Sequence, residues 1–589
     1  MADRPADSAC HVGVPQPGLK DACTSGLCVL DLAFGAGEAF FRTWREWENA
    51  SDRPSMLHYV AVVTHAPRLD DLHAAQHWRG DEPGKFEQLA AQWQGLEPGF
   101  QRLSLAQGRL LLTLWWGPMD AGLREMAFVA DRIWLDSTAS GNEPNHWNVW
   151  HGKALARVCR RGTQLWCREL APAQHAALTA SGFVIHEQGH RRGEYRHCGD
   201  YSPRWEIRHT RVPFSTQVSE ATSCVVIGAG LAGASIAATL ARRGWQVDVL
   251  DRADTPAAGA SGLPAGLLVP HVSADDCPLS RLSRAGVRST LAQARTLLHK
   301  GLDWGPTGVM ELPLRGASRF QASGADERWH ANAAWVKPAK LVQAWLAQPG
   351  IRFLGGSQVS ALRRHLDHWE VMNPDGRQLA RAKRVILANG LGALPLLTGL
   401  QQGMPPWGMP DLRLPALSGV YGLVSWGFED EVPQAQFPAW PVNGSGSLAP
   451  GIPVGERKAW FAGAGYHPCE LPVPSASECH RANLDRLTGL LPELAQTLRP
   501  AFEKGRVHAW EQIRCATPDR LPLAGPVDED KAPGLWLFVG LGSRGLTFSA
   551  LGAELIAARW AGEPLPLSLS LARRLEAARA MRPPQTEAP

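Results

Sequence analysis

The first readable part of the chain alternates short apolar runs with amphipathic stretches. Within residues 27–188, the segment "RLDDLHAAQHW" (68–78) has the spacing of a helix, and several apolar runs have strand length. Strands that alternate with helices are typical of a parallel α/β sheet. We therefore predict an α/β domain over 27–188. Its predicted strands are "LCVLDLAF" (27–34), "LHYVAVVT" (57–64), "LLLTLWW" (110–116), "DRIWLDS" (131–137) and "TQLWCREL" (163–170).

A second alternation of the same kind begins at Ser223 and predicts another α/β domain over residues 223–572. Its middle, residues 401–455, is rich in proline and glycine, which predicts long loops. Two domains also agree with the length of 589 residues, because single cores stop growing at roughly 250 to 300 residues. The remaining segments are predicted to be a loose tail (1–26), an arginine-rich linker (189–222) and a second tail (573–589).

Composition describes an ordinary globular chain, with 44% hydrophobic and 20% charged residues. The formal charge of +4 permits an anionic partner without requiring one. No apolar run approaches the roughly 20 residues that cross a bilayer, and the first residues do not resemble a secretion signal. We expect a cytoplasmic protein without membrane contact. The 11 cysteines include no CxxC pair, so we expect reduced thiols and no metal site.

The strongest chemical signal is a glycine-rich turn. In "SCVVIGAGLAGASIAATLARRGWQVDVLDR" (223–252), three glycines follow an apolar strand and open an alanine-rich helix. Gly228 allows the tight turn, Gly230 lets backbone amides approach a pyrophosphate, and Gly233 lets the helix pack on the strand. Asp251 ends the next strand, where its carboxylate can accept hydrogen bonds from ribose hydroxyls. This unit predicts dinucleotide binding.

Further small-residue loops separate FAD from NAD. "GASGLPAGLLVPHVS" (259–273) follows the second strand, and "LWLFVGLGSRGLTFSALGAELIA" (535–557) reads as a strand, a glycine loop and a helix. The start of that last helix can face the electron-rich edge of a reduced flavin. The loop residues that we expect to contact the cofactor are Ser261, Gly262, Gly540, Gly542, Ser543, Arg544 and Gly545.

With "VILANG" (385–390) and "IRCATPDRLPLAG" (513–525), these segments resemble the FAD-dependent D-amino-acid oxidase and glycine oxidase superfamily over about 223–570. The resemblance implies FAD, oxidation at CH–NH groups, and an antiparallel-sheet substrate subdomain beside the FAD-binding α/β domain. In that superfamily, an arginine in R-x-x-T-P-D commonly grips the substrate carboxylate. Arg514 occupies that place and is the predicted catalytic residue, with a surface ion pair as the alternative.

The first domain carries an imperfect glycine turn, in which Asp31, Gly35 and Gly37 follow the strand and Ala33 stands in place of the first glycine. A class I methyltransferase-like Rossmann domain joined to a glycine-oxidase-like domain resembles the bacterial bifunctional proteins of tRNA 5-methylaminomethyl-2-thiouridine biosynthesis. In that family, the FAD domain removes the carboxymethyl group from 5-carboxymethylaminomethyl-2-thiouridine. The N-terminal domain then methylates the primary amine with S-adenosylmethionine.

Other positions of the first domain depart from the family pattern. Thr64 stands where a carboxylate holds the ribose, and Pro118 stands where an aspartate contacts adenine. Asp136, the predicted catalytic residue of this domain, is kept, but the family's Gly-Phe-x-Pro turn after it is lost, although Asn142, Pro144 and Trp147 remain. These changes predict weakened S-adenosylmethionine binding, because a lost charged hydrogen bond costs about 1.5 to 3 kcal/mol. A degenerate domain kept for folding or tRNA contact is the alternative.

A tRNA substrate follows from the resemblance only, since no RNA-binding motif is present and nothing indicates DNA. The oligomeric state stays open. Two alternatives to the tRNA function remain, namely a small-molecule amine oxidase with an inert N-terminal domain and a non-catalytic RNA-binding scaffold that retains FAD. The linker offers a cluster of arginines that can contact phosphates, or form solvated surface: Arg191, Arg192, Arg196, Arg204, Arg208 and Arg211.

Overall fold

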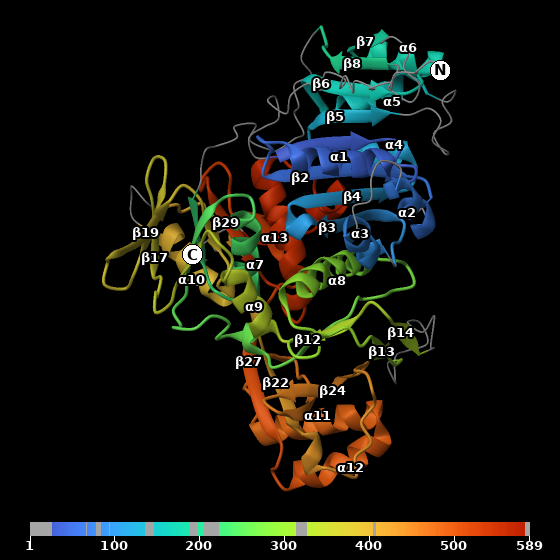
Figure 1. Ribbon diagram of the computed structural model, residues 1–589. Coiled ribbons are helices and arrows are strands. Elements are labelled where there is room, and N and C mark those ends of the chain that lie inside the picture. Colours follow the sequence, from blue (N-terminus) through green and yellow to red (C-terminus); the bar gives the residue numbers. More distant parts are fainter. Residues whose placement is uncertain are drawn as a thin grey trace, which may run out of the picture.

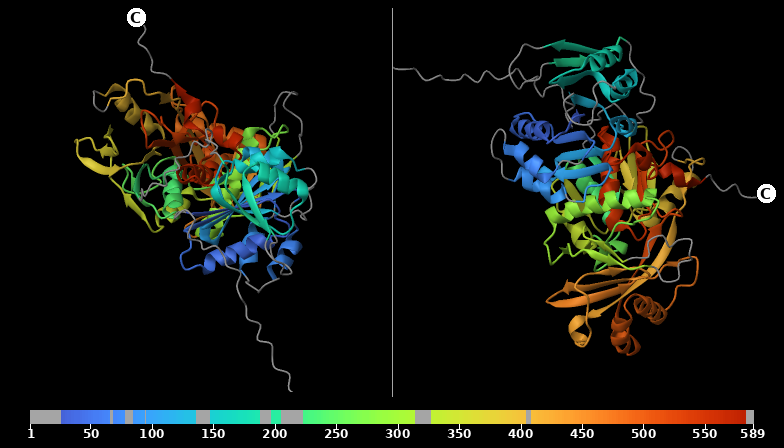
Figure 2. Two further views of the ribbon diagram at one scale, coloured as in Figure 1. Left: turned by 90° about the horizontal axis from the view of Figure 1, so that it is seen from above. Right: turned by 90° about the vertical axis from the view of Figure 1, so that its right-hand side faces the viewer.

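The protein is arranged in three tiers in the computed structural model (Figure 1). The N-terminal α/β domain lies against a second α/β domain, from whose far side an antiparallel sheet projects (Figures 1 and 2). The structure describes residues 26–65, 68–77, 84–93, 95–135, 147–187, 197–204, 223–313, 327–403 and 408–582.

The N-terminal domain is built on an eight-stranded sheet, in the order β3-β4-β2-β1-β5-β6-β8-β7. The central strands β4, β2, β1, β5 and β6 run parallel, which confirms the predicted α/β class. The strands are β1 (Gly26–Asp31), β2 (Met56–Val63), β3 (Gly99–Leu105), β4 (Leu110–Trp116), β5 (Ala130–Leu135), β6 (Cys159–Cys167), β7 (Phe183–Glu187) and β8 (His197–Tyr201). The helices are α1 (Glu38–Asn49), α2 (Leu69–His77), α3 (Lys85–Trp93), α4 (Met119–Glu125), α5 (Val149–Ala156) and α6 (Pro172–Ala180).

Strand β8 lies inside the predicted linker, so the boundary at residue 188 is wrong. It pairs antiparallel with β6 and β7, and His197 and Tyr201 at its two ends are buried. Its five residues, "HCGDY", have no apolar alternation, so the sequence pattern did not predict a strand here. Backbone hydrogen bonds to the two neighbouring strands hold β8 in the sheet. The first domain therefore extends to at least Tyr201.

The second domain is centred on a six-stranded sheet, in the order β16-β10-β9-β20-β29-β28. Its helices α7 and α13 pack against each other and are buried almost all round, as their apolar sequences require. The strands are β9 (Ser223–Ile227), β10 (Gln246–Leu250), β16 (Ile351–Leu354), β20 (Val385–Leu387), β28 (Leu523–Pro526) and β29 (Leu535–Val539). The helices are α7 (Leu231–Ala241), α8 (Pro278–Leu297), α9 (Pro338–Leu346), α10 (Ala393–Gln402), α13 (Gly545–Ala561) and α14 (Leu569–Arg573), with short turns η4 (Ala260–Gly262), η5 (Gly390–Gly392) and η7 (Ala577–Ala580).

A second eight-stranded sheet forms the far tier, and most of its strand pairs are antiparallel. Much of the proline- and glycine-rich stretch 401–455 forms strands here, where we expected long loops, because its apolar residues pack under two helices. The strands are β13 (Val309–Glu311), β14 (Arg328–His330), β22 (Ser418–Phe428), β23 (Val442–Asn443), β24 (Ser447–Val454), β25 (Arg457–Gly463), β26 (His467–Pro468) and β27 (His508–Ala516). The two helices are α11 (Ala476–Leu490) and α12 (Pro492–Glu503).

Smaller sheets complete the second domain. Their strands are β11 (Gly266–Leu268), β12 (Trp304–Gly305), β15 (Ala334–Val336), β17 (Ala361–Arg364), β18 (Trp369–Met372), β19 (Gln378–Ala382), β21 (Leu414–Pro415) and β30 (Met581–Arg582).

The predicted C-terminal tail is ordered in its first part, which corrects the boundary at residue 572. Leu575 and Ala577 are fully buried, and β30 pairs with β21. The arginine- and alanine-rich sequence hides this packing, because only a few apolar side chains contact the core. The second domain therefore extends to about residue 582.

Buried charges join the two α/β domains. Arg243, just after α7, donates hydrogen bonds to Glu563 (Nε, 3.0 Å; Nη2, 2.8 Å) and to Glu554 (Nη2, 2.8 Å). From the first domain, His58 Nε2 lies 3.4 Å from Glu563, and Arg102 donates at 2.6 Å to the backbone carbonyl that follows Glu563. Burial alone would raise the pKa of Glu563, but Arg243 and His58 hold that pKa well below its usual range. Most pairs of this cluster thus form within the second domain, and His58 and Arg102 bring the first domain into contact with it.

We expect Arg243→Leu to lower the free energy of unfolding by about 3 to 5 kcal/mol, because it leaves Glu554 and Glu563 buried with less compensating charge. Denaturant unfolding measures this loss, and Arg352→Leu, which removes an exposed ion pair with Asp248, should change stability little. Because the folded-state pKa of Glu563 is depressed, its contribution is present above the unfolded pKa of about 4.5 and is lost as pH falls. Equal effects of the two variants at neutral pH would contradict the interpretation.

Candidate functional sites in the two domains

The turn between β9 and α7 is closed to any side chain larger than glycine. A Cβ on Gly233 would lie 1.7 Å from the carbonyl oxygen of Gly228, and a Cβ on Gly228 would lie 2.7 Å from that of Ala388. Gly228 also has a φ of 108°, which favours glycine. The backbones of the strand, the turn and the helix are therefore in direct contact, and the first amides of α7 are directed out of the turn.

Asp251 and Ser261 lie beside this turn. The Asp251 carboxylate accepts hydrogen bonds from the N–H of Ala229 (2.7 Å) and of Ala253 (2.9 Å). Ser261 Oγ accepts from the N–H of Leu231, the first residue of α7, at 2.9 Å. The loop with Ser261 and Gly262 thus lies over the helix start, next to the glycine turn.

The third predicted loop meets the same place. Gly545 begins α13, and a Cβ there would lie 3.0 Å from a methyl carbon of Leu231, so the starts of α7 and α13 lie together. Gly540 and Gly542 have φ values of 76° and 54°, and the N–H of Gly542 donates to the carbonyl of Cys515. That contact joins the loop 540–545, with Ser543 and Arg544, to the end of β27.

Arg514 lies on β27, one residue before Cys515, and its guanidinium is directed at the loop between β25 and β26. It donates from Nη2 to the carbonyl of Gly465, and it stands 4.5 Å above the ring of Tyr466. Gly422 on the paired strand makes room, since a Cβ there would lie 2.2 Å from Arg514 Nη2. The structure therefore brings Arg514 to the flavin loop, and the predicted surface ion pair is not formed with any carboxylate of the described residues.

The electrostatics of this region are positive. Burial lowers the pKa of Arg514 and of Arg544, and Tyr466 acts on both guanidinium groups in the opposite direction. Burial, and to a smaller extent the positive charge of Arg544, lower the pKa of His271, so that its imidazole is neutral at pH 7. Two cations that lack a carboxylate partner in the described residues suit a substrate carboxylate.

These residues fit FAD. The amides at the start of α7 suit a pyrophosphate, the Asp251 carboxylate suits ribose hydroxyls, and the glycine cradle leaves no room for a side chain in their place. All the predicted cofactor loops converge here. The sequence did not indicate Tyr466 or Gly465, because their loop has no motif and reaches Arg514 only through strand pairing.

The glycine turn of the N-terminal domain retains part of a cofactor site. Asp31 is buried, and its carboxylate accepts from the N–H of Ala33 (2.8 Å) and from the hydroxyl of Tyr59 (2.6 Å). Gly35 and Gly37 have φ values of 53° and 85°, whereas Ala33 is not among the described non-glycine residues with positive φ. Alanine therefore replaces the first glycine without backbone strain.

Thr64 and Pro118 lie at the same edge of the sheet as Asp31. Thr64 follows β2, and Gly117, after β4, donates its N–H to the carbonyl of Val63. Pro118 precedes α4 and offers no side-chain acceptor. The turn fits S-adenosylmethionine, but both flanking positions lack the carboxylates that would hold its ribose and adenine.

Several predicted positions lie outside the described residues: Asp136, Asn142, Pro144, Arg191, Arg192, Arg196, Arg208 and Arg211. Trp147 is buried and stacks with His151, with ring centroids 5.6 Å apart, and Arg204 is exposed. Among the described helices, none is both long and apolar enough to span a bilayer.

The fold and the glycine cradle define an FAD-binding oxidoreductase domain that is joined to a methyltransferase domain. Residues 223–331 and 318–559 match the family described as FAD dependent oxidoreductase, and residues 82–198 match the family described as S-adenosyl-L-methionine-dependent methyltransferase. The methyltransferase match includes the first residues of β8, in agreement with the extended first domain.

Proteins with both domains are similar to this chain over almost its whole length. The tRNA 5-methylaminomethyl-2-thiouridine biosynthesis bifunctional protein MnmC of Albidiferax ferrireducens is 47% identical, over 98% of this chain and 97% of the relative. The protein of the same name from Polaromonas naphthalenivorans is 41% identical, over 93% and 89%. The chain belongs to the family of these bifunctional proteins.

We expect Gly233→Ala to abolish FAD loading, because the new methyl group collides with the backbone of the turn. The flavin absorbance of the purified protein measures this. Gly399→Ala, within α10, is the matched control: beyond the adjacent helix backbone, no atom lies within 4 Å of its added Cβ, and it should keep full flavin content. Full flavin content in Gly233→Ala would contradict the assignment of the turn.

We expect Thr64→Glu to tighten S-adenosylmethionine binding roughly tenfold or more, because a charge-assisted hydrogen bond contributes about 1.5 to 3 kcal/mol. Isothermal titration calorimetry measures the dissociation constant. His65→Glu adds the same charge at the next position and should change affinity little. The interpretation of Thr64 fails if both variants bind alike.

Proposed function

We propose that this chain takes part in the biosynthesis of 5-methylaminomethyl-2-thiouridine in tRNA. Its second domain oxidatively removes the carboxymethyl group of 5-carboxymethylaminomethyl-2-thiouridine and leaves 5-aminomethyl-2-thiouridine. The observation that carries the proposal is the position of Arg514 and Arg544, two cations without a carboxylate partner in the described residues, beside the convergent flavin loops. The substrate group is a glycine-like N-carboxymethyl amine, whose carboxylate suits such cations.

The reaction breaks one C–H bond next to nitrogen. Bound FAD supplies the chemistry of accepting a hydride, and the substrate carbon and nitrogen are left as an imine. Water then adds to the imine carbon, and the C–N bond breaks to give the primary amine on the nucleoside and glyoxylate. Arg514 would hold the carboxylate and so fix the orientation of the neighbouring methylene carbon.

The first domain, in the same proposal, methylates the resulting primary amine with S-adenosylmethionine. The turn at Asp31, Gly35 and Gly37 supports cofactor binding, while Thr64 and Pro118 lower the expected affinity. The alternative is a domain that is retained for folding or tRNA contact without methyl transfer. Action on tRNA also implies a cytoplasmic location.

Two further alternatives are less well supported. A small-molecule amine oxidase would have no use for a methyltransferase domain, which here is joined to the oxidoreductase by a buried ion cluster. A scaffold that keeps FAD structurally would not need Arg514 beside the flavin loop. Full-length similarity to the bifunctional proteins also favours the tRNA reaction.

The decisive experiment uses tRNA isolated from cells that lack this activity. The purified protein is incubated with it, with and without S-adenosylmethionine, and digested nucleosides are analysed by mass spectrometry. Conversion of the carboxymethylaminomethyl nucleoside supports the oxidative step, and appearance of the methylated nucleoside supports methyl transfer. If the carboxymethylaminomethyl nucleoside persists while free glycine or sarcosine reduces the flavin, the tRNA proposal is wrong.

We expect Arg514→Ala to lower kcat/KM for oxidation roughly 10- to 100-fold while flavin content stays normal, because one charged hydrogen-bonding partner of the carboxylate is lost. Arg506→Ala is the control, since it removes an exposed arginine just before the other end of β27. Loss of FAD from Arg514→Ala would make the residue structural, and unchanged turnover would refute the clamp.

A further inference from the structure

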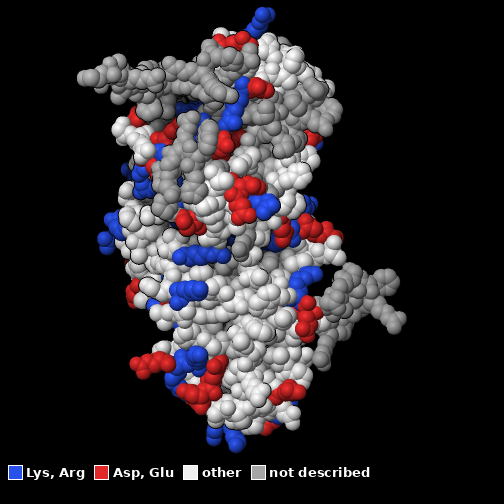
Figure 3. Space-filling model, turned by 45° about the vertical axis from the view of Figure 1, so that its right-hand side comes forward, with Lys and Arg blue, Asp and Glu red and all other residues white. Residues whose placement is uncertain are grey.

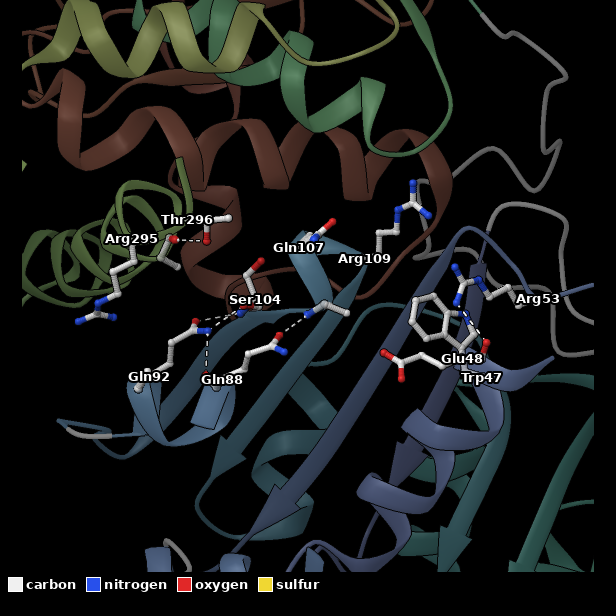
Figure 4. Close-up of a pocket in the computed structure, with 14 residues that line it drawn as sticks. Trp47, Glu48, Arg53, Gln88, Gln92, Ser104, Gln107, Arg109, Arg295 and Thr296 are labelled. Carbon is white, nitrogen blue, oxygen red and sulfur yellow. Dashed lines mark hydrogen bonds between the residues drawn. The ribbon is translucent and has the colours of Figure 1, made fainter. Parts of the chain in front are cut away.

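A polar cleft lies where the two α/β domains meet. Its volume is about 680 Å³, and side chains of α1, α3, the β3–β4 turn and α8 line it. Figure 4 shows Arg295 and Thr296 of α8 on one side, and Trp47 and Arg53 on the other. Arg109 stands between them, together with Ser104 and Gln107.

The floor of this cleft is an unusual turn held by side chains. Ala106, Gln107 and Gly108 are three successive residues with positive φ, of 47°, 57° and 85°. Gln88 of α3 accepts a hydrogen bond from the N–H of Ala106 at 3.0 Å, and Gln92 bonds both backbone groups of Ser104. Non-glycine residues in this conformation are uncommon and gather at functional positions. Two glutamines thus hold the turn that presents Gln107 and Arg109.

The cleft is lined by arginine side chains that have no carboxylate partner among the described residues. Arg109 and Arg295 are exposed and have no ion pair with a described residue, and Arg53 stacks 5.1 Å above the ring of Trp47. The carboxylate of Glu48 is already engaged, since it pairs with Lys85 at 2.8 Å and accepts from an indole N–H. Figure 3 shows basic and acidic side chains mixed over the face that it presents. The cleft is therefore a local site for anions.

The cleft is remote from both catalytic regions. Arg109 precedes β4, whereas Thr64 and Gly117 lie at the opposite edge of the sheet, roughly 20 Å away for a strand of this length. On the other side, α8 contacts the backbone of His271 through Ser283. Arg295 lies further along that helix, roughly 18 Å away at about 1.5 Å per residue. A ligand in the cleft therefore reaches neither cofactor.

The two domains hold the cleft together. Arg288 of α8 donates to the backbone carbonyls of Gln92 (3.1 Å) and Gly95 (2.5 Å) in the first domain. The walls are thus fixed relative to each other before a ligand arrives, and both domains contribute cations.

We infer that this cleft holds the phosphodiester backbone of the substrate RNA, at a segment distant from the nucleoside that reacts; the inference rests on the proposed function. The three guanidinium groups are spread along the cleft, which suits successive phosphates of one strand better than a single phosphate, whose oxygens would need convergent donors. Such an anchor would be shared by the oxidative and the methylating steps, because both domains form it.

The test compares the FAD-loaded full-length protein with the variant R109Q/R295Q, whose two arginines make no described ion pair that folding would lose. Binding of a whole unmodified tRNA transcript and of its short anticodon stem-loop is measured by fluorescence anisotropy over a range of salt concentrations. The control R377Q/R413Q removes two exposed arginines, near β19 and β21, that do not line the cleft. Normal flavin content and melting temperature establish that each variant is folded.

We expect R109Q/R295Q to bind whole tRNA on the order of tenfold more weakly, with the slope of log Kd against log salt reduced by about 1.5. Stem-loop affinity and the control variant should be unchanged. Because the transcript is unmodified, this result does not depend on catalysis, and failure of the proposed reaction would be seen separately in the nucleoside assay.

Two results would overturn the inference. One is an unchanged affinity and salt slope for whole tRNA in R109Q/R295Q. The other is binding of inorganic phosphate or AMP to the wild type that the variant loses while tRNA binding is kept, which would make the cleft a site for a free anion.

Discussion

The ion cluster around Arg243 is the interaction on which the arrangement of this protein depends. Helix α7 begins at the glycine cradle of the flavin site and ends beside Arg243, so one helix joins the cofactor turn to the domain boundary. Glu554 and Glu563 lie on and after α13, whose own start forms the other flavin loop. Since buried charges are tolerated only when they are paired, the two helices and the first domain must keep their relative positions.

The same constraint connects chemistry that is distributed over the molecule. In the second domain, α7 and α13 extend from the cluster to the flavin loops beside Arg514. In the first domain, β2 contains His58 of the cluster and ends just before Thr64, at the edge of the methyltransferase-like site. The oxidative product, a primary amine, is the substrate that the first domain would methylate. In the proposed function, a fixed geometry would let both domains act on one bound RNA, whereas a flexible tether would leave each encounter to diffusion.

The two cofactor sites differ in how completely their contacts are kept. The FAD site has its glycine cradle, Asp251 and Ser261 in mutual hydrogen-bonding contact. In the first domain, Asp31 is well held by Tyr59 and the turn backbone, yet the neighbouring strand ends carry Thr64 and Pro118. Ala33 has no positive φ, so the lower S-adenosylmethionine affinity that we expect is attributed in the described residues to Thr64 and Pro118 and not to Ala33.

The sequence by itself determined the features that depend on local contacts. The strand, glycine turn and helix of residues 223–252 are consecutive in the chain, and their chemistry follows from backbone access, so Gly228, Gly230, Gly233 and Asp251 could be assigned without coordinates. Only the tertiary structure decided the features that join distant segments. Tyr466 reaches Arg514 through strand pairing, β8 is held by its neighbours and has no apolar pattern of its own, and the buried pairing of Arg243 with Glu563 joins residues 320 positions apart. Such contacts depend on which surfaces pack together, and that packing is a property of the whole fold.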